Sequence, residues 1–344
     1  MSKNKFGRYF VDDLEEIVAS SKQYFAPLEG SKILIIGGTG FVGTWLTTAL
    51  LYARKKGLLE FDLTVGARNS ELVASKLELQ DDQKLELREL DFMKAQTDIS
   101  GSFTHLIHSA TPSSPATGGT DEALVRKVSI NAADYLVEVA RRQSIKPVFM
   151  HLSSGAVYGK QEIMNSKLSE NGLKENSNHL ETSYSKVKFD LERIVEKADQ
   201  SSIVRGTNPR LFAFAGPGIA LDAHFAVGNF LHDALSKREI ELKGNPLTER
   251  SYLYPTDMVT WLIACLANPT LEPTHIGSDV ALSMQEIAGV TSKSTSNVPI
   301  TNGNSLAPQT SYVPETKKTR ERYGLKQEVD FAESIKRWAA WLQN

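Results

Sequence analysis

Apolar residues fall in two alternating patterns, short continuous runs and positions spaced as on one face of a helix. The run Ile33–Ile36 is typical of a strand that is buried on both faces of a parallel sheet. Further runs predict strands at 63–67, 85–90, 105–109 and 147–153, and a sixth strand within 203–214. Helical spacing predicts helices at 44–54, 121–142 and 182–197. This alternation indicates an α/β fold with a doubly wound parallel sheet.

The pattern loses its regular alternation after about residue 206. Helices are predicted at 222–237, from a capping Thr256 through Ala267, and along the apolar stripe Phe331, Ile335, Trp338 and Leu342. Short strands are predicted at 240–242 and 251–254, and a long surface loop at 291–314. We interpret this part as a smaller C-terminal α/β lobe that caps the open end of the sheet.

The first thirty residues precede the first strand of the sheet. Phe10, Leu14, Ile17 and Val18 fall at helical spacing with acidic residues between them, which predicts one amphipathic helix packed on the body or on another subunit. The expected parts are therefore an N-terminal extension at 1–30, a dinucleotide-binding domain at 31–205 and the smaller lobe at 206–344. The sixth-strand region 203–214 is shared between the last two.

Composition narrows the class of protein. The 344 residues are 41% hydrophobic with a net charge of -2, and no basic block suggests a nucleic-acid partner. No apolar stretch approaches the ~20 residues that span a bilayer, and the acidic start is unlike a secretory signal. Cys265 is the single cysteine, so an intramolecular disulfide is excluded. We expect a cytoplasmic protein without a metal site.

Candidate chemistry begins directly after the first strand, at Gly37, Gly40 and Gly43. The first glycine permits the turn, the second lets a pyrophosphate approach the backbone, and the third lets helix and strand pack closely. Phe41 and Val42 then open a helix whose free N–H groups face the phosphates. Such glycines also occur in ordinary loops without a ligand, but the strand–turn–helix context favours dinucleotide binding.

Tyr184 and Lys188 lie four residues apart at the start of a predicted helix, so both side chains share one face. Lowering the pKa of a phenol by ~3 units requires about 4 kcal/mol. We expect the Lys188 ammonium and a positive nicotinamide ring to supply this stabilisation. Ser154 ends the fifth strand and can hold a substrate hydroxyl or carbonyl near Tyr184. His108 and His151 are interpreted as structural.

Together these motifs resemble the extended short-chain dehydrogenase/reductases, with their Rossmann-type sheet, and most closely the nucleotide-sugar epimerase/dehydratase group. The resemblance covers about residues 31 to 342 and includes two segments of the second lobe, 226–230 and 250–257. It implies an enzyme that uses NAD or NADP on a nucleotide sugar, and a homodimer formed through the helices at 121–142 and 182–197.

The resemblance implies a role for each matching residue. Ser154, Tyr184 and Lys188 would form the catalytic triad, with Tyr184 as acid/base and Lys188 also bonding the nicotinamide ribose. Asn229 and Arg250 would contact the substrate diphosphate. The cofactor would be bound by the residues that match the family's dinucleotide site: Gly37, Gly40, Phe41, Val42, Gly43, Arg68, Asp91 near the adenine, Ala110, Asn131 as support for the active-site helix, Tyr184 and Lys188.

Three departures from the family narrow the reaction. Family members that dehydrate or decarboxylate carry acids where this chain has Gly155 and Ala156, so these two reactions are disfavoured. A 4-epimerase and a 4-ketoreductase, which need only hydride transfer with Tyr184 and Ser154, stay open. Ala213 replaces an asparagine that is common in sugar epimerases, which leaves the substrate orientation open.

The cofactor also stays open between NAD and NADP. Arg68 stands after the second strand, where NAD-selective members usually have an acid. An arginine there accommodates a 2'-phosphate and favours NADP and a reductase, or it merely packs on the adenine of NAD. Two other functional hypotheses remain: a catalytically silent dinucleotide-binding protein, and a reductase of a carbonyl compound without a nucleotide.

Overall fold

Six parallel strands form the central sheet in the order β5-β4-β3-β6-β7-β9. The computed structural model of the chain describes residues 4–77, 85–94, 100–112, 121–159, 167–172, 180–221, 225–303 and 307–344. The strands of the sheet are β3 (Ser31–Ile36), β4 (Phe61–Ala67), β5 (Leu85–Glu89), β6 (His105–His108), β7 (Val148–His151) and β9 (Arg205–Thr207). The strand order reverses between β3 and β6, which confirms the predicted doubly wound sheet.

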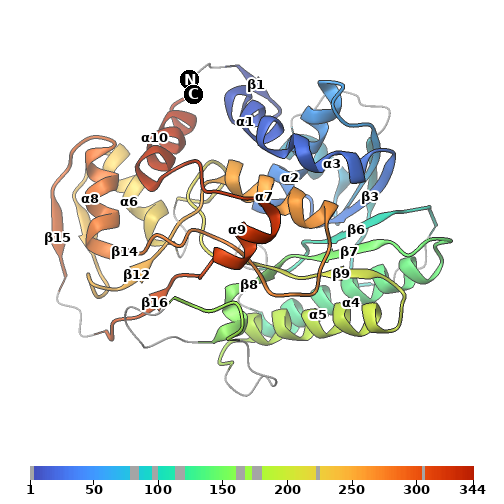
Figure 1. Cartoon of the computed structure of the whole chain (residues 1–344). Coiled ribbons are helices and arrows are strands. Elements are labelled where there is room, and N and C mark those ends of the chain that lie inside the picture. Colours follow the sequence, from blue (N-terminus) through green and yellow to red (C-terminus); the bar gives the residue numbers. More distant parts are fainter. Residues whose placement is uncertain are drawn as a thin grey trace.

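Helices cover both faces of this sheet (Figure 1). On one face lie α4 (Glu122–Arg141) and α5 (Ser183–Gln200), and on the other α1 (Val11–Ser21), α2 (Phe41–Lys55), α3 (Ser70–Leu77) and α7 (Pro255–Ala267). Successive residues of β3 serve opposite faces: Ile33 and Ile35 pack in the core with α2 and α7, whereas Leu34 and Ile36 pack in the core with α4 and α5. This explains the continuous apolar run of the first strand.

The smaller lobe builds its own core from three helices: α6 (Ala226–Leu235), α8 (Met284–Lys293) and α10 (Phe331–Leu342). Its short strands are β11 (Ile240–Leu242), which pairs with β15 (Ile300–Asn302), and β12 (Glu249–Arg250), which lies between β14 (Leu282–Ser283) and β16 (Ser311–Tyr312). The first positions of the predicted helix 222–237, residues 222–224, lie outside the described residues.

A further sheet joins the two parts of the molecule. It has the parallel order β13-β10-β8, with β8 (Ser153–Ser154), β10 (Pro209–Leu211) and β13 (Thr274–Ile276). Two further helices are the 3₁₀ turn η4 (Gly155–Tyr158), which follows β8, and α9 (Lys317–Tyr323). The sixth strand was predicted as one element, but it is divided between β9 and β10, each in a different sheet.

Three local predictions in the second lobe are wrong. The strand expected at 251–254 is instead β12, two residues earlier, and the segment 291–314 contains β15 and β16 rather than only loop. Pairing with β11 and β12 holds these two short segments in an extended conformation. Thr256 does not cap α7, because Tyr254 is the N-cap residue and the Thr256 hydroxyl donates to Glu16 at 2.7 Å.

The N-terminal helix α1 is confirmed and packs on the body of the same chain. Leu14, Ile17 and Val18 are buried in the core that also contains α2 and α7. Before α1, the hairpin β1 (Lys5–Phe6) and β2 (Tyr9–Phe10) places Tyr9 in a stack on Trp45, with ring centroids 3.7 Å apart. The 3₁₀ turns η1 (Lys22–Tyr24) and η2 (Ala26–Leu28) lead from α1 to β3.

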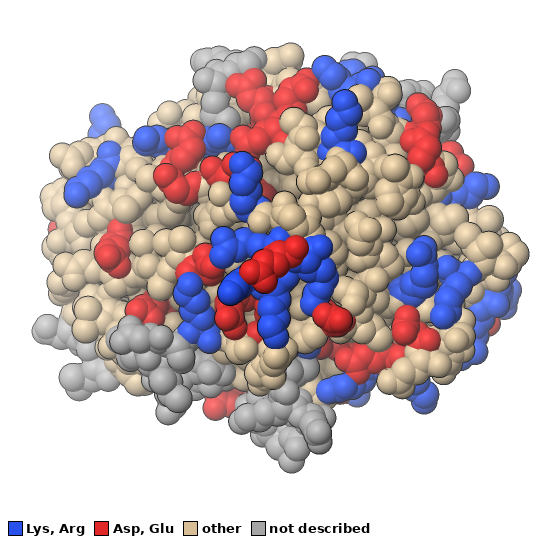
Figure 2. All heavy atoms as spheres, in the orientation of Figure 1, with Lys and Arg blue, Asp and Glu red and all other residues tan. Residues whose placement is uncertain are grey.

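Charges of both signs are interspersed over the surface in the view of Figure 2, with a group of lysines and arginines over α9 that also contains acids. Within the described part of the chain, no helix is long and apolar enough to cross a membrane. No group of three or more His, Cys, Asp or Glu side chains among those same residues is arranged to hold a metal ion.

Candidate functional site

Two of the three glycines in the turn after β3, Gly37 and Gly43, leave no room for a side chain. Gly37 has φ +90°, and a Cβ there would lie 2.6 Å from the carbonyl carbon of Ser109. A Cβ at Gly43 would lie 2.4 Å from the Gly37 oxygen, so this glycine allows α2 to pack closely on the turn. At Gly40, by contrast, the nearest atom is 3.5 Å away and the residue is exposed. The turn is therefore open to a ligand at Gly40.

The N-terminus of α2 begins at this open position. Its N-cap is Gly40, which provides no side chain to bind the first N–H groups of the helix. Phe41, Val42 and Gly43 form the first turn and contain no acid. The free N–H groups and the positive end of the helix dipole suit a pyrophosphate, so the turn fits the phosphates of a dinucleotide.

The loop after β6 lies directly beside the turn. Ile36 and His108 pair across β3 and β6, and the backbone nitrogen of Ala110 would be 2.7 Å from a Cβ at Gly37. These two strand ends form the crevice at which the strand order reverses, the place where doubly wound sheets bind ligands. The predicted Ala110 therefore lies at this crevice.

The remaining predicted cofactor residues follow the next strands of the sheet. Arg68 comes directly after β4, is exposed, and has no ion-pair partner within the described ranges. The Asp91 carboxylate accepts a hydrogen bond from the Met93 nitrogen at 3.0 Å. Asn131 donates its side-chain amide to the Phe92 carbonyl at 2.8 Å, so it fastens the segment that contains Asp91 to α4.

Ser154 lies in β8, which follows β7. Tyr184 and Lys188 lie in the first turns of α5, which packs against β8. The Nζ atom of Lys188 donates to the Leu152 carbonyl at 2.5 Å and lies 5.7 Å from the centroid of the Tyr184 ring. The Ser154 hydroxyl accepts a hydrogen bond from the Ala156 nitrogen at 3.1 Å. The three residues predicted as a triad are thus gathered at one end of the sheet.

Burial dominates the pKa values of this group. It raises the pKa of Tyr184, and hydrogen bonding with Ser154 offsets only part of that effect. Burial also lowers the pKa of Lys188 to about 7, against the opposing charge of Glu192. The chain's own residues therefore do not produce the lowered phenol pKa that the sequence predicted, because desolvation outweighs the favourable contacts.

Two aromatic residues that the sequence analysis did not single out close the site at Gly155. A Cβ there would lie 2.5 Å from the Phe212 ring and 2.6 Å from the Tyr312 hydroxyl. The ring centroids of Phe212 and Tyr312 are 5.0 Å apart. Tyr312 belongs to β16 in the second lobe, more than a hundred residues after Gly155. No local sequence pattern predicts a contact between residues so far apart in the chain.

Arg250 reaches the same region through β12, which pairs it with Tyr312 in register. Its Nη1 donates to the Glu249 carbonyl at 2.7 Å and to the Thr310 hydroxyl at 3.2 Å, and no carboxylate pairs with it in the described part of the chain. Burial lowers its pKa. Such a guanidinium suits an anionic ligand. Asn229, the other predicted diphosphate contact, is exposed on α6.

A buried polar network lies behind the triad. Glu192 of α5 accepts from two nitrogens of Arg210 at 2.9 and 2.8 Å and from the Ser153 hydroxyl at 2.5 Å. Arg210 also donates to the Tyr158 oxygen at 2.7 Å, and Tyr158 contacts His275 Nε2 at 2.6 Å. This network fastens β8, β10 and β13 to α5, so it fixes the segment that presents Ser154.

His108 and His151 are both buried, as the structural interpretation expects. Their Nδ1 atoms are 3.1 Å apart, and His108 Nε2 lies 3.0 Å from the Ser129 carbonyl oxygen. Burial lowers the pKa of His108 to about 3 and that of His151 well below its ordinary value, so both rings are neutral. His151 Nε2 has no hydrogen-bond partner among the described residues.

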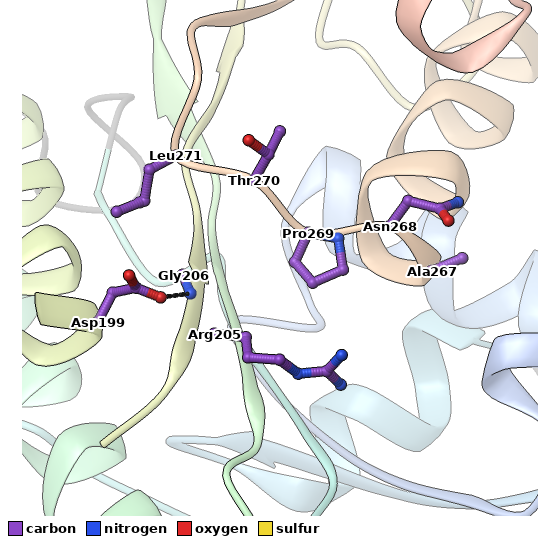
Figure 3. Close-up of a pocket in the computed structure, with 8 residues that line it drawn as sticks. All are labelled: Asp199, Arg205, Gly206, Ala267, Asn268, Pro269, Thr270 and Leu271. Atoms are coloured by element: carbon purple, nitrogen blue, oxygen red, sulfur yellow. Dashed lines mark hydrogen bonds between the residues drawn. The ribbon is translucent and has the colours of Figure 1, made fainter. Parts of the chain in front are cut away.

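A separate pocket, shown in Figure 3, lies away from these residues. It is lined by Asp199, Arg205, Gly206 and the segment 267–271. Arg205 is the first residue of β9, so the pocket is at the amino edge of the sheet. The triad and the glycine turn are at the opposite, carboxyl edge, and the pocket therefore belongs to neither.

Comparison with curated proteins finds nucleotide-sugar enzymes. UDP-glucuronic acid decarboxylase 1 of Arabidopsis thaliana is 25% identical over 261 residues, which cover 75% of this chain and 57% of that protein. A Bacillus subtilis protein described as an uncharacterized UDP-glucose epimerase is 25% identical over 269 residues, which cover 75% of this chain and 80% of that protein. The chain thus spans little more than half the length of the plant relatives.

Solved structures share the fold. A UDP-glucose 4-epimerase from Thermotoga maritima, with UDP-glucose, has a TM-score of 0.75 and 18% identity, over 91% of this chain and 98% of that one. A UDP-glucuronic acid 4-epimerase from Bacillus cereus, with UDP-glucuronic acid and NAD, has a TM-score of 0.73 and 18% identity, over 91% and 99%. Residues 33–277 also match the family described as "NAD dependent epimerase/dehydratase family". The chain therefore belongs to the NAD-dependent epimerase/dehydratase family.

Proposed function

We propose that this protein transfers a hydride at C4 of a nucleotide-linked sugar, as a 4-epimerase or a 4-ketoreductase. The observation that carries the proposal is the convergence of Tyr184, Lys188 and Ser154 at the carboxyl edge of the sheet, where the glycine turn also lies. Arg250 approaches the same group from the second lobe. Proton transfer, dinucleotide binding and anion binding would then meet at one site.

In the proposed mechanism each residue has a distinct task. Tyr184 would move the proton of the C4 oxygen, and Ser154 would hold that oxygen by a hydrogen bond. Lys188, fixed by the Leu152 carbonyl, would favour the phenolate and hold the ribose of the dinucleotide. Arg250 would hold the substrate diphosphate. A nicotinamide dinucleotide bound at Gly37, Gly40 and Gly43 would supply the hydride chemistry.

Elimination of water or of carbon dioxide is not part of the proposal. Neither Gly155 nor Ala156 has a group that transfers a proton. An acid at position 155 would also collide with the side chains of Phe212 and Tyr312, which come within 2.6 Å of the first added carbon. This packing supports the distinction from the decarboxylases to which the chain is similar.

One observation, at Arg68, supports a reductase as the alternative to an epimerase. Arg68 is exposed after β4 and has no carboxylate partner within the described ranges, which suits the 2'-phosphate of NADP. A reductase would consume one reduced cofactor in each turnover, whereas an epimerase would restore its NAD. The choice of cofactor therefore tests the choice of reaction.

The proposal also assigns tasks to the parts of the chain. Residues 31–205 would bind the dinucleotide and residues 206–344 the nucleotide sugar. A homodimer would form through α4 and α5, which lie side by side on one face of the sheet (Figure 1). Light scattering during gel filtration would measure the mass of the assembly, and a mass of one chain would contradict the dimer.

The deciding experiment identifies the cofactor that copurifies, by mass spectrometry, and then tests turnover. UDP-glucose, UDP-glucuronic acid and UDP-N-acetylglucosamine would be incubated with the full chain, and 4-epimers separated by chromatography. A 4-keto derivative of each with NADPH would test the reductase through the absorbance of reduced cofactor. Retained NAD with 4-epimer formation supports the epimerase. Turnover of sugar-free ketones at equal rates would contradict the proposal.

A further inference from the structure

Tyr9, in the N-terminal hairpin, contacts the first turn of α2. Its ring is fully buried and stacks on Trp45, with the ring centroids 3.7 Å apart and the planes at 20° to each other. Its hydroxyl oxygen lies 2.9 Å from that of Thr44. The indole of Trp45 donates to the Pro217 carbonyl at 2.8 Å, which fixes the stack at a second point. The phenol is thus held against the helix end at which the glycine turn opens.

The Thr44 hydroxyl decides the direction of the bond with Tyr9. It donates to the carbonyl oxygens of Gly40 and Phe41, at 2.9 and 3.0 Å. A threonine hydroxyl has one proton, and carbonyl oxygens only accept, so the proton of Thr44 goes to these carbonyls. The Tyr9 hydroxyl is therefore the donor to Thr44. Donation runs from the N-terminal hairpin through Thr44 to the carbonyls of the open turn.

The second lobe shields this bond. Gly218 has φ +95°, and a Cβ there would lie 3.4 Å from the Tyr9 hydroxyl and 3.5 Å from the Phe41 ring. The centroid of the Phe41 ring is 5.9 Å from that of Phe214. The chain that leads from β10 into the second lobe therefore packs on the first turn of α2. Tyr9 and Thr44 are 0% and 2% exposed, so water does not compete for the bond between them.

Gly40 depends on such support because it has no side chain of its own to fix it. It is the exposed N-cap of α2, and its φ and ψ of -75° and 171° lie outside the helical region. Glycine has more backbone freedom than any other residue, and freedom that is lost on binding lowers affinity. A carbonyl that is fixed before the ligand arrives keeps the N–H groups of the first turn in place for a pyrophosphate.

We propose that Tyr9 is a positioning residue of the dinucleotide site: through Thr44 it holds the Gly40 end of the turn in the conformation that binds a pyrophosphate. The segment that matches the family begins at residue 33, so this support comes from a part of the chain outside the match. The proposal rests on the proposed function only for dinucleotide binding at the glycine turn, and not for the reaction at C4.

The test compares two variants of the full chain, each of which removes one phenol bond between the N-terminal extension and α2. Tyr9→Phe keeps the ring that stacks on Trp45 but loses the bond to Thr44. Tyr52→Phe, the matched control, loses the bond to Glu15 at 2.5 Å, near the opposite end of α2. Calorimetric titration with NAD and NADP should show a Kd that is raised about 3- to 10-fold in Tyr9→Phe, the effect of one neutral hydrogen bond, and unchanged in Tyr52→Phe.

Hydrogen exchange without any ligand, followed by mass spectrometry, reports on the turn itself. The amides of the segment 37–44 should exchange faster in Tyr9→Phe than in the wild type. In Tyr52→Phe they should exchange at the wild-type rate. A general loss of stability would instead speed exchange in both variants, so this measurement separates positioning of the turn from a merely structural role.

Substitutions at Thr44 test whether Tyr9 acts through this residue. Thr44→Val removes the hydroxyl and should weaken dinucleotide binding, whereas Thr44→Ser keeps the hydroxyl and should bind as the wild type does. In the Thr44→Val background, Tyr9→Phe should cause no further loss of affinity, because the connecting hydroxyl is gone. An additional loss of the full size in that background would contradict action through Thr44.

Equal dinucleotide affinity in the wild type and Tyr9→Phe, or an equal loss in Tyr9→Phe and Tyr52→Phe, would overturn the role of Tyr9. A wild type that takes up neither NAD nor NADP would overturn both this role and the proposed function. A protein that binds a dinucleotide, loses affinity in Tyr9→Phe and turns over no sugar nucleotide would contradict the proposed function and leave the role of Tyr9 standing.

Discussion

The ammonium of Lys188 is bonded to the carbonyl oxygen of Leu152 at 2.5 Å, two residues before Ser154. This bond joins α5 to the strand end that presents the serine, so the lysine and the serine are positioned by one contact. The same lysine lies 5.7 Å from the ring centroid of Tyr184. This arrangement therefore holds the phenol, the lysine and the serine of the proposed triad close together.

This relationship predicts different results for the two residues of α5. Tyr184→Phe should reduce turnover at least ~10²-fold, the contribution expected of a general acid/base, while dinucleotide binding stays intact. Lys188→Met should reduce turnover and also weaken dinucleotide binding, since it removes the proposed ribose contact. Turnover assays and fluorescence titration with NAD and NADP measure the two effects. Full activity in Tyr184→Phe would contradict the assignment.

Arg250 is predicted to act on substrate binding alone. Arg250→Gln should raise the KM for a UDP-sugar and weaken binding of UDP measured by calorimetry, because the diphosphate loses its charged partner. Dinucleotide affinity should not change. Arg238→Gln, which removes an exposed guanidinium paired with Asp233 at 2.7 Å, is the control. Equal UDP affinity in both variants would remove Arg250 from the substrate site.

Gly155 should not tolerate even one added methyl group. Gly155→Ala would place a carbon within 2.6 Å of both Phe212 and Tyr312, and we expect a loss of about 1–3 kcal/mol in the free energy of unfolding. Gly289→Ala is the matched control, since it lies within α8 and a Cβ there meets nothing within 4 Å. The control should gain roughly 0.5–1 kcal/mol. Urea denaturation compares the two, and a neutral Gly155→Ala would show that the aromatic pair moves freely.

Glu192 and Arg210 form a buried ion pair whose loss should be costly. The two side chains are 1% and 6% exposed and 2.8 Å apart. Glu192→Leu would leave the Arg210 guanidinium buried without its partner, at a cost of about 3–5 kcal/mol. The pair Lys326–Glu328 is equally close at 2.7 Å but its lysine is 76% exposed, so Lys326→Ala should change stability little. Similar unfolding midpoints for the two variants would contradict this dependence on burial.

The N-terminal extension should add a pH dependence to stability through Asp13. This carboxylate is buried between Tyr254 at 2.9 Å and Arg337 at 3.1 Å, and burial raises its pKa from 3.8 to about 6. The folded state then binds a proton that the unfolded state has released, so the stability from this group is fully present below 3.8 and is lost as the pH rises through about 6.

Asp13→Asn, which imitates the protonated form, removes this dependence. Relative to the variant, the wild type should lose about 2–3 kcal/mol of unfolding free energy between pH 4 and 7. Comparing the two proteins cancels the opposite effect of the neutral histidines His108 and His151, which destabilise the fold as the pH falls below 6.5. A difference between the proteins that is the same at every pH would show that Asp13 titrates normally.

The sequence by itself determined the central sheet and pointed to the three residues that we propose as the triad. The run Ile33–Ile36 and the helical spacing that follows it depend only on neighbouring residues, and so does the spacing of Tyr184 and Lys188. Local patterns carry this information because strand burial and helix faces repeat within a few residues. The position of Ser154 at a strand end could be read in the same way.

Only the tertiary structure decided what surrounds these residues. Tyr312 meets Gly155, and Arg210 meets Glu192, across separations that no periodicity records. The strands β15 and β16 form because β11 and β12 pair with them, and the sequence around residues 291–314 does not record these distant partners. The pKa of Tyr184 within the chain alone depends on the tertiary structure for the same reason: desolvation raises it, and the packed environment that causes desolvation exists only after distant segments have come together.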